Sequence, residues 1–241
     1  RPDVEKDVKR LISYSIGCMI GRYSLEEPGL IYAHSGNEGF DATRYKTYPA
    51  DDDGILPVTD VEYFNDDAAK RFEEFIRTVW SPDTLEENLK FIAEALTGKK
   101  NTDSREAIRK YLSSNFYKDH LQTYKNRPIY WLFSSGKLKA FECLVYLHRY
   151  NNTTLSRMRT EYVTKLKGML SGRIQLIEKD IASASKGSST KLRKEQETLQ
   201  KKLVELNAFD DNLRHYADMN ISLDLDDGVK VNYTKLGAIL E

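Results

Sequence analysis

The sequence predicts a mainly α-helical fold with small β-hairpins, which places the chain in the α+β class. Three patterns support this class: apolar residues recur at helical spacing, an aromatic run over Arg127–Ser135 is β-prone, and a heptad pattern follows Asn151. We expect a compact α+β portion over residues 1–150 and a long antiparallel helical hairpin over residues 151–219. A C-terminal β-hairpin over residues 220–241 is expected to pack on the first portion.

In the compact portion, the apolar pattern predicts helices joined by loops. The first helix is expected over Val4–Tyr23, where Gly17 and Gly21 allow close approach of a neighbouring element. Residues 24–61 have the composition of loops and short strands. A second helix is expected to carry the apolar side chains between Phe64 and Trp80 on one side.

Helix boundaries are clearest after residue 80. Ser81 is the expected N-cap of the next helix, Pro82 its first residue, and Gly98 the residue beyond its end. A further helix over Ser104–Phe116 leads to residues 127–150. That stretch forms two strands, or a strand and a buried helix, because it is too uniformly apolar for its periodicity to decide.

Apolar side chains recur three and four positions apart on both sides of a polar loop, Ser183–Thr190. Two such segments predict an antiparallel helical hairpin with arms of about 40 Å at 1.5 Å per residue. The expected seam residues are Leu155, Met158, Tyr162, Leu166, Met169 or Leu170, Arg173 or Ile174, Ile177 and Ile181 in the first arm, and Leu192, Gln196, Leu199, Leu203, Leu206, Leu213 and Ala217 in the second.

Two acidic clusters raise the question of metal binding. The expected C-terminal β-hairpin turns at Asp227-Gly228, between two β-prone runs. Asp224, Asp226 and Asp227 lie too close together for an EF-hand calcium loop. Asp51–Asp53 has no second ligand cluster at a suitable spacing. We therefore expect a turn at each cluster rather than a metal site.

Composition indicates a soluble intracellular protein of 241 residues. The longest apolar run, Leu11–Ile20, is far short of the roughly 20 residues needed to span a bilayer. Cys18 and Cys143 each lie in an apolar run, and we expect both to be buried free thiols, in keeping with a reducing cytoplasm. Because the chain begins with Arg1, we expect it to be an excised part of a longer protein.

The formal net charge is zero, but the charges are strongly separated along the chain. Residues 26–87 carry 5 basic and 16 acidic side chains, whereas residues 88–202 carry 24 basic and 10 acidic. The basic section is a candidate polyanion-binding face, and the acidic section is a candidate docking face for a basic neighbour. The alternative is that both sections are ordinary solvated surfaces.

No catalytic motif is recognisable in the sequence. An amino-methyltransferase needs an Asn/Asp-Pro-Pro-aromatic loop, but no two of the six prolines are adjacent, and no glycine-rich nucleotide loop is present. The four histidines lack zinc-ligand spacing, Pro82-Asp83 lacks the partners of a nuclease site, and no serine lies in a nucleophile elbow. We therefore expect no catalytic residue, no cofactor and no metal in this chain.

Binding chemistry remains, because cations and aromatic side chains interleave between residues 117 and 149. Cations neutralise phosphates, and aromatic faces stack on unpaired bases. The aromatics Tyr117, Tyr124, Tyr130 and Trp131 either contact bases or belong to the core, and we prefer the core for Tyr130, Trp131 and Phe133. The candidate DNA-binding residues are Lys118, Lys125, Arg127, Lys137, Lys139 and Arg149.

Three segments share the pattern of a known family: SIGCMIGRYSLEEPGLIYA (Ser15–Ala33), FYKDHLQTYKNRPIYWLFSSGK (Phe116–Lys137) and LDLDDGVKVNYTKLG (Leu223–Gly237). Together they resemble the C-terminal region of the adenine-specific DNA methyltransferases of bacterial BREX phage-defence systems, the PglX type. Related type II restriction-modification adenine methyltransferases have similar tails. The cofactor-binding and Asn-Pro-Pro-aromatic motifs of the family lie upstream, so no catalytic residue carries over to this chain.

The resemblance implies a non-catalytic region that recognises or holds double-stranded DNA. S-adenosylmethionine binding and methyl transfer to adenine N6 then belong to the upstream methyltransferase domain of the same chain. A second hypothesis is a protein-interaction module that docks other defence-system proteins through the helical hairpin. An independent hydrolase is not expected, for lack of a site. The expected location is the cytoplasm, with no membrane partner.

Overall fold

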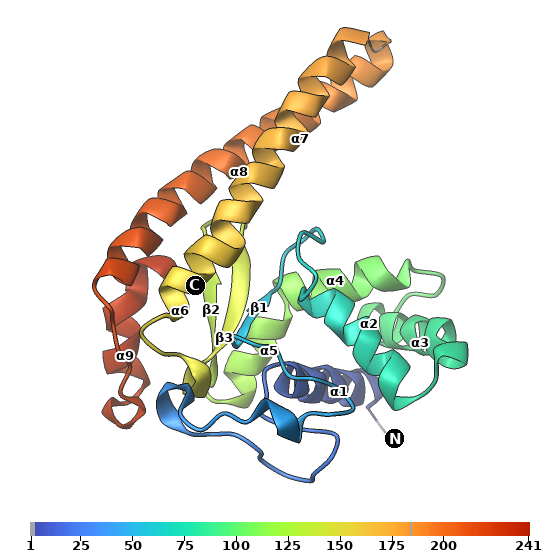
Figure 1. The fold of residues 1–241 in the computed structure, drawn as a ribbon. Helices are drawn as coiled ribbons and strands as arrows, with labels where there is room; N and C mark the ends of the chain where they lie inside the picture. The colour runs from blue at the N-terminus through green and yellow to red at the C-terminus, as the bar shows by residue number, and fades with distance from the viewer. Residues whose placement is uncertain (1–2, 184) are drawn as a thin grey trace.

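The computed structural model describes residues 3–183 and 185–241, with helices on both sides of a small sheet (Figure 1). The sheet has three antiparallel strands in the order β1-β3-β2, with β1 at Ile55–Pro57, β2 at Tyr130–Ser134 and β3 at Glu142–Tyr146. Of the two alternatives for residues 127–150, the two-strand prediction is therefore correct. The mainly helical α+β class is confirmed as well.

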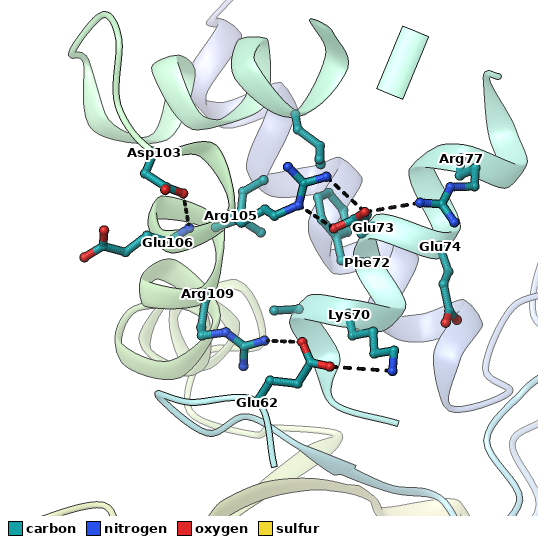
Figure 2. A pocket seen from close by; sticks show the side chains of 13 residues that line it. Glu62, Lys70, Phe72, Glu73, Glu74, Arg77, Asp103, Arg105, Glu106 and Arg109 are labelled. Atoms are coloured by element: carbon teal, nitrogen blue, oxygen red, sulfur yellow. Dashed lines mark hydrogen bonds and ion pairs between the residues drawn. The ribbon is translucent and has the colours of Figure 1, made fainter. Parts of the chain in front are cut away.

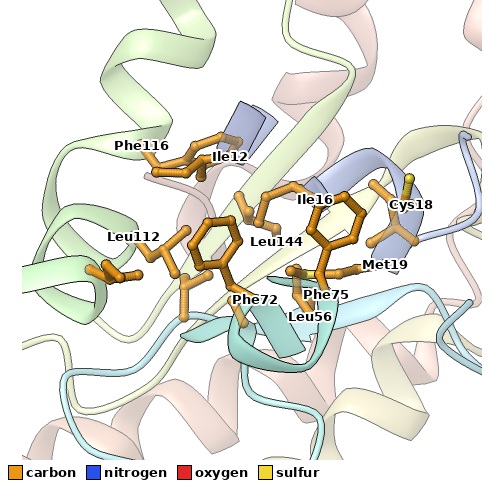
Figure 3. Packing of buried hydrophobic residues seen from close by; sticks show 14 of the residues in the cluster. Ile12, Ile16, Cys18, Met19, Leu56, Phe72, Phe75, Leu112, Phe116 and Leu144 are labelled. Carbon is orange, nitrogen blue, oxygen red and sulfur yellow. The ribbon is translucent and has the colours of Figure 1, made fainter. Parts of the chain in front are cut away.

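Helices α1 to α5 pack around one face of the sheet. The core on this face contains Leu56 of β1, Leu132 of β2 and Leu144 of β3 together with apolar side chains of these helices, as Figure 3 shows for part of it. The helices are α1 (Val4–Met19), α2 (Ala68–Val79), α3 (Leu85–Thr97), α4 (Ser104–Ser114) and α5 (Phe116–Thr123).

The opposite face of the sheet carries a second core. Ile55, Trp131 and Val145, the sheet positions that alternate with those of the first core, pack against the helical hairpin and the C-terminal segment. Both faces of the sheet are thus buried, and residues 130–134 and 142–146 are buried at every position. This explains why no alternation of apolar and polar residues is present there.

The first helix is four residues shorter than its pattern predicts. It ends at Met19, because Gly21 adopts φ +83°, a conformation that favours glycine. A Cβ atom on Gly17 would lie 2.4 Å from the ring of Tyr23, so this glycine does allow a close approach. Short 3-10 turns at Ser35–Asn37 and Ala42–Arg44 follow in the loop region.

The boundaries predicted after residue 80 agree with the structure. The Ser81 side chain accepts a hydrogen bond from the Asp83 amide and caps a 3-10 turn, Pro82–Thr84, that leads into α3. Gly98 ends α3 with φ +65°. The helix expected at Ser104 is present, and Asn115 separates it from α5.

The helical hairpin extends away from the sheet (Figure 1). After a 3-10 turn at Leu147–Arg149, its first arm comprises α6 (Thr154–Arg157), a π-helical turn (Met158–Val163) and α7 (Thr164–Ser183). The second arm is α8 (Lys186–Asp218), whose 33 residues span about 50 Å at 1.5 Å per residue. Helix α8 begins before the predicted loop ends, so the connection is shorter than expected.

Most of the predicted seam is present, and the structure decides its two open positions. Leu170 and Ile174 are buried, whereas Met169 is 44% exposed and Arg173 lies on the outside. Leu206 is fully buried near the sheet end of α8. The carboxylate of Asp210 accepts hydrogen bonds at 2.8 Å from Arg159 and from Lys167, which joins the arms at their base. Leu199 and Leu203, further along the seam, are only half-buried.

The predicted C-terminal β-hairpin is wrong. Leu225–Asp227 forms a 3-10 turn, Val229–Leu236 forms helix α9, and a further 3-10 turn covers Gly237–Ile239. Gly228, with φ +81°, precedes the helix instead of closing a β-turn. The segment does pack on the compact portion: Leu240 forms a bridge with Phe133 on the edge strand β2.

Candidate nucleic-acid interface

The loop after α5 presents two cations to solvent. Lys125 and Asn126 adopt left-handed conformations, with φ values of 51° and 59°, and the Asn126 amide donates to the Leu121 carbonyl at 2.8 Å. Pro128 is buried and fixes the end of the loop against the body. The side chains of Lys125 and Arg127 are exposed and make no hydrogen bond or ion pair with any described residue. They are therefore free to contact phosphates.

Lys118 and Lys139 line a small hollow of about 50 Å³ beside the end of α4. Lys118 is exposed and has no partner among the described side chains. Lys139 donates to the Ser113 carbonyl at 3.2 Å and pairs with the buried Glu142 at 3.1 Å. Burial raises the pKa of Glu142, and the charge of Lys139 opposes that shift. Lys139 therefore has a structural role besides any contact with a ligand.

A larger groove of about 780 Å³ adjoins this hollow. Tyr117 and Glu241 line both, so Lys118, Lys139 and Arg127 lie along one continuous face. The far wall of the groove belongs to α9 and contributes Lys230, which makes no ion pair with the described residues. The other lining residues include Leu121, Asn126, Pro128, Asp227, Val229 and Tyr233.

Lys230 is not among the residues predicted to bind DNA, because those lie in the basic and aromatic stretch between residues 117 and 149. The apolar residues Val229, Tyr233 and Leu236 are four and three positions apart, which is helical spacing. That spacing was the available signal for α9 and for the face on which Lys230 lies.

Lys137 lies at the opposite end of β2 from Arg127. It is exposed in the turn between β2 and β3, where Gly136 adopts φ +130°. The carboxylate of Glu205 on α8 holds this turn, accepting from the Leu138 amide at 2.7 Å and the Ser135 hydroxyl at 2.8 Å. Lys137 therefore belongs to the surface beside the helical hairpin rather than to the groove.

Arg149 cannot serve as a DNA-binding residue. Its side chain is buried, with 1% of the residue exposed. The guanidinium donates to the carbonyl oxygens of Asp51 and Asp52 and to the side chain of Asn37, and it lies 3.7 Å from the centroid of the Phe40 ring. The buried guanidinium is thus held by groups of the protein itself, so the prediction for this residue is corrected.

The aromatic residues divide as the core interpretation predicts. Tyr130, Trp131 and Phe133 are at least 98% buried and belong to the two cores. Tyr117 and Tyr124 are half-buried at the candidate face. Of the aromatic residues considered in the sequence, Tyr117 and Tyr124 remain available to contact a base.

The acidic cluster at Asp51–Asp53 forms a turn. The Asp51 carboxylate accepts from the amides of Asp53 and Gly54, at 3.0 and 2.8 Å. Tyr162 donates to Asp66 at 2.6 Å and connects the base of the first arm to this region. Within residues 3–183 and 185–241, no three His, Cys, Asp or Glu side chains are arranged to hold a metal ion.

Another hollow, of about 580 Å³, lies among α2, α3 and α4 (Figure 2). Most of its charged side chains pair with one another: Arg105 forms two hydrogen bonds with Glu73, and Glu62 lies between Lys70 and Arg109. Arg109 also pairs at 2.9 Å with the buried Asp67. Arg105 also pairs with Glu86 at 2.6 Å, so this network fastens α2, α3 and α4 together, and most of the charged side chains that line the hollow are paired within the protein.

No helix in the described part of the chain is long and apolar enough to cross a membrane. Cys18 and Cys143 are free and buried, as expected.

Comparison with known proteins places this architecture in context, although no family model matches the chain. It is 57% identical over 242 residues to the adenine-specific methyltransferase BrxX of Escherichia coli O9:H4 (strain HS), with 97% of the chain aligned. It is 44% identical over 242 residues to the adenine-specific methyltransferase PglX of Lacticaseibacillus casei (strain Zhang), with 99% aligned. The chain spans only 20% of the length of each relative.

Proposed function

Because the chain is homologous over nearly its whole length to one part of the BREX-type adenine-specific methyltransferases, we propose that it is their non-catalytic DNA-holding region. In this proposal it follows the catalytic domain and contacts double-stranded DNA through backbone phosphates. Binding of S-adenosylmethionine and transfer of the methyl group to adenine N6 take place in the other part of the protein. The place of action is the cytoplasm.

One observation carries the proposal. Lys118, Arg127 and Lys230 come from three separate elements, line two adjoining hollows, and have no charged partner in the described part of the chain. Lys125 lies beside Arg127 on the same loop. Exposed cations without counter-charges are the groups that replace condensed counterions when a protein binds DNA.

The salt dependence of DNA binding tests the proposal. Binding of a fluorescent duplex to the parent methyltransferase is measured at several salt concentrations, with and without the triple change Lys118→Glu, Lys125→Glu and Arg127→Glu. We expect the triple variant to bind all duplexes more weakly, and its log–log slope to flatten by about 0.9 per lost phosphate contact. Unchanged affinity and slope in a folded triple variant would exclude this face as the DNA contact.

A second candidate function is a protein-interaction module, and one feature of α8 favours it. Val204 is 70% exposed and lies with the 44% exposed Leu138 in a shallow hollow of about 470 Å³. Changing Val204 to Glu separates the two hypotheses. It should leave DNA binding intact, but it should release a bound defence-system protein if this surface docks one.

A further inference from the structure

Arg22 lies in an unusual electrostatic environment just after α1. Its Nε donates to the Tyr23 hydroxyl at 3.2 Å and its Nη1 to the Tyr146 hydroxyl at 3.3 Å. The guanidinium carbon is 5.4 Å from the centroid of the Tyr23 ring. The side chain is half-buried, and no carboxylate of the described residues forms an ion pair with it. Its contacts are therefore all with neutral groups.

The other arginines of the described chain do not share this arrangement. Every buried or half-buried arginine among them forms a hydrogen bond or an ion pair with a carboxylate or with a backbone carbonyl. Arg109 contacts Asp67, Arg149 contacts the carbonyls of Asp51 and Asp52, and the remaining examples are Arg44, Arg71, Arg157 and Arg159. Among the buried and half-buried arginines that the structure describes, Arg22 is the one whose contacts are all with hydroxyl groups.

The groups around Arg22 add no negative charge. Burial, and then the positive charge of Arg22, lower the pKa of His148, whose Nδ1 is buried without a hydrogen-bond partner. Burial raises the pKa of Tyr124, against the effect of the same guanidinium, so this hydroxyl also stays neutral. Tyr124 immediately precedes the exposed Lys125 in the loop of the candidate DNA face.

A cation that is partly withdrawn from water without a counter-charge is unfavourable unless a ligand supplies one. Arginine has five N–H donors in a planar fork, and the two tyrosines engage two of them. The Tyr124 hydroxyl is a further hydrogen-bond partner of the guanidinium. The donors that remain match the oxygens of a phosphate in their geometry. The aromatic surroundings hold the side chain in place for such contact.

We propose that Arg22 is the anchor of a phosphate-binding site that takes one phosphate of a nucleic-acid backbone, with Lys125 as the neighbouring cation. This inference rests on the proposed function and extends its contact face by a residue 103 positions upstream of Lys125. The same donors would equally bind a free phosphorylated molecule. Two measurements therefore distinguish the two sources of the phosphate.

The first measurement is the melting temperature of this 241-residue chain in phosphate and in chloride, at equal ionic strength and pH. A ligand that binds only the folded state raises the melting temperature. We expect phosphate to stabilise the wild type and the control variant Arg10→Met, whose arginine is exposed and pairs with Asp7 at 3.2 Å. Arg22→Met should lose the effect, and Arg22→Lys, which keeps the charge without the fork, should retain part of it.

The second measurement is duplex binding by the parent methyltransferase that carries the same substitutions. Loss of a charge-assisted contact should weaken binding about tenfold or more in Arg22→Met and leave Arg10→Met unchanged. Phosphate stabilisation through Arg22 without an effect on DNA would identify a site for a free phosphorylated molecule and overturn the assignment to the DNA backbone. Equal phosphate effects in the wild type and Arg22→Met, or none in either, would overturn the site itself.

Discussion

The guanidinium of Arg149 lies 2.8 Å from the carbonyl oxygen of Asp52, a residue 97 positions earlier in the chain. Through this contact the segment after β3 holds the loop that precedes β1. Gly54 allows it, because a Cβ atom there would lie 3.0 Å from the Arg149 side chain and because its φ is +74°. A basic residue from the most basic section of the sequence thus fastens the core instead of facing a ligand.

Changing Arg149 to Met should destabilise the protein by about 3 kcal/mol, because buried carbonyl oxygens lose their donors. Arg127→Met is the matched control, since that side chain is exposed and unpaired, and it should alter the unfolding free energy by less than about 0.5 kcal/mol. Urea denaturation of both variants measures the difference. Equal stability of the two would contradict the structural role of Arg149.

The sequence predicted the elements whose patterns are local. The cap at Ser81, the stop at Gly98 and the seam containing Leu206 all depend on neighbours within a few positions, and all three are present. The apolar pattern of the first helix continues past its end, because the pattern does not show that the backbone of Gly21 adopts a left-handed conformation and ends the helix.

What the sequence could not show depends on contacts between distant segments. The run Val229–Tyr233 is both β-prone and helically spaced, and the packing of Leu236 and its neighbours on the second core decides in favour of the helix. Nothing near Arg149 in the sequence indicates that carbonyls from residues 51 and 52 would satisfy it. Likewise, Arg127 and Lys230 line the same groove because α9 docks beside α5 and the loop that follows it.

His120 should make stability depend on pH. Its Nε2 accepts from the amides of Ile129 and Tyr130, at 3.2 and 3.3 Å, so the folded state holds the ring neutral. Burial, and then the charge of Arg22, lower its pKa to about 4 from an ordinary value of 6.5. The folded state then binds fewer protons than the unfolded state between these values. The free energy of unfolding should therefore have its full value above pH 6.5. It should fall towards pH 4 by about 1.4 kcal/mol per pH unit.

The variant His120→Gln isolates this contribution, because the glutamine carbonyl can accept the same amides without titrating. Urea denaturation between pH 4 and pH 8 should show a steeper acid loss in the wild type than in the variant. Parallel curves would mean that His120 titrates normally in the folded protein.

Asp51 should make stability depend on pH in the direction opposite to His120. Burial raises the pKa of its carboxyl well above 3.8, and the neighbouring Asp53 adds to the shift. The folded state therefore binds more protons than the unfolded state, and stability is lost as the pH rises above 3.8 through the folded value. Asp51→Asn keeps the acceptor for the amides of Asp53 and Gly54. It should be more stable than the wild type at pH 7, and the advantage should vanish near pH 3; a destabilised variant at pH 7 would contradict the shift.

The seam of the helical hairpin should be most sensitive near the sheet. Leu206→Ala should cost about 3 kcal/mol, because the side chain is fully buried and its removal leaves a cavity. Leu199→Ala, at a half-buried position, should cost roughly a third of that. Val204→Ala is the exposed control on the same helix. Thermal or urea denaturation ranks the three variants by their loss of stability. An equal loss of stability in the Leu199 and Leu206 variants would show that the distal seam is packed as tightly as the base.

The last prediction concerns Lys230, because the two walls of the groove should contribute equally to DNA binding. Arg127 and Lys230 line the same groove from opposite elements, and neither has a charged partner among the described residues. If both contact phosphates, Lys230→Glu and Arg127→Glu should each reduce the magnitude of the salt slope by about 0.9 in the parent methyltransferase.

Lys179→Glu on the distal part of α7 is the control, because it makes a charge change of the same size at an exposed site with no ion pair among the described residues. It should leave the slope unchanged, since distant exposed charges are screened within about 10 Å at 0.1 M salt. Equal slopes for all three variants would mean that net charge governs binding. An effect at Arg127 alone would place the DNA on the loop after α5 and away from α9.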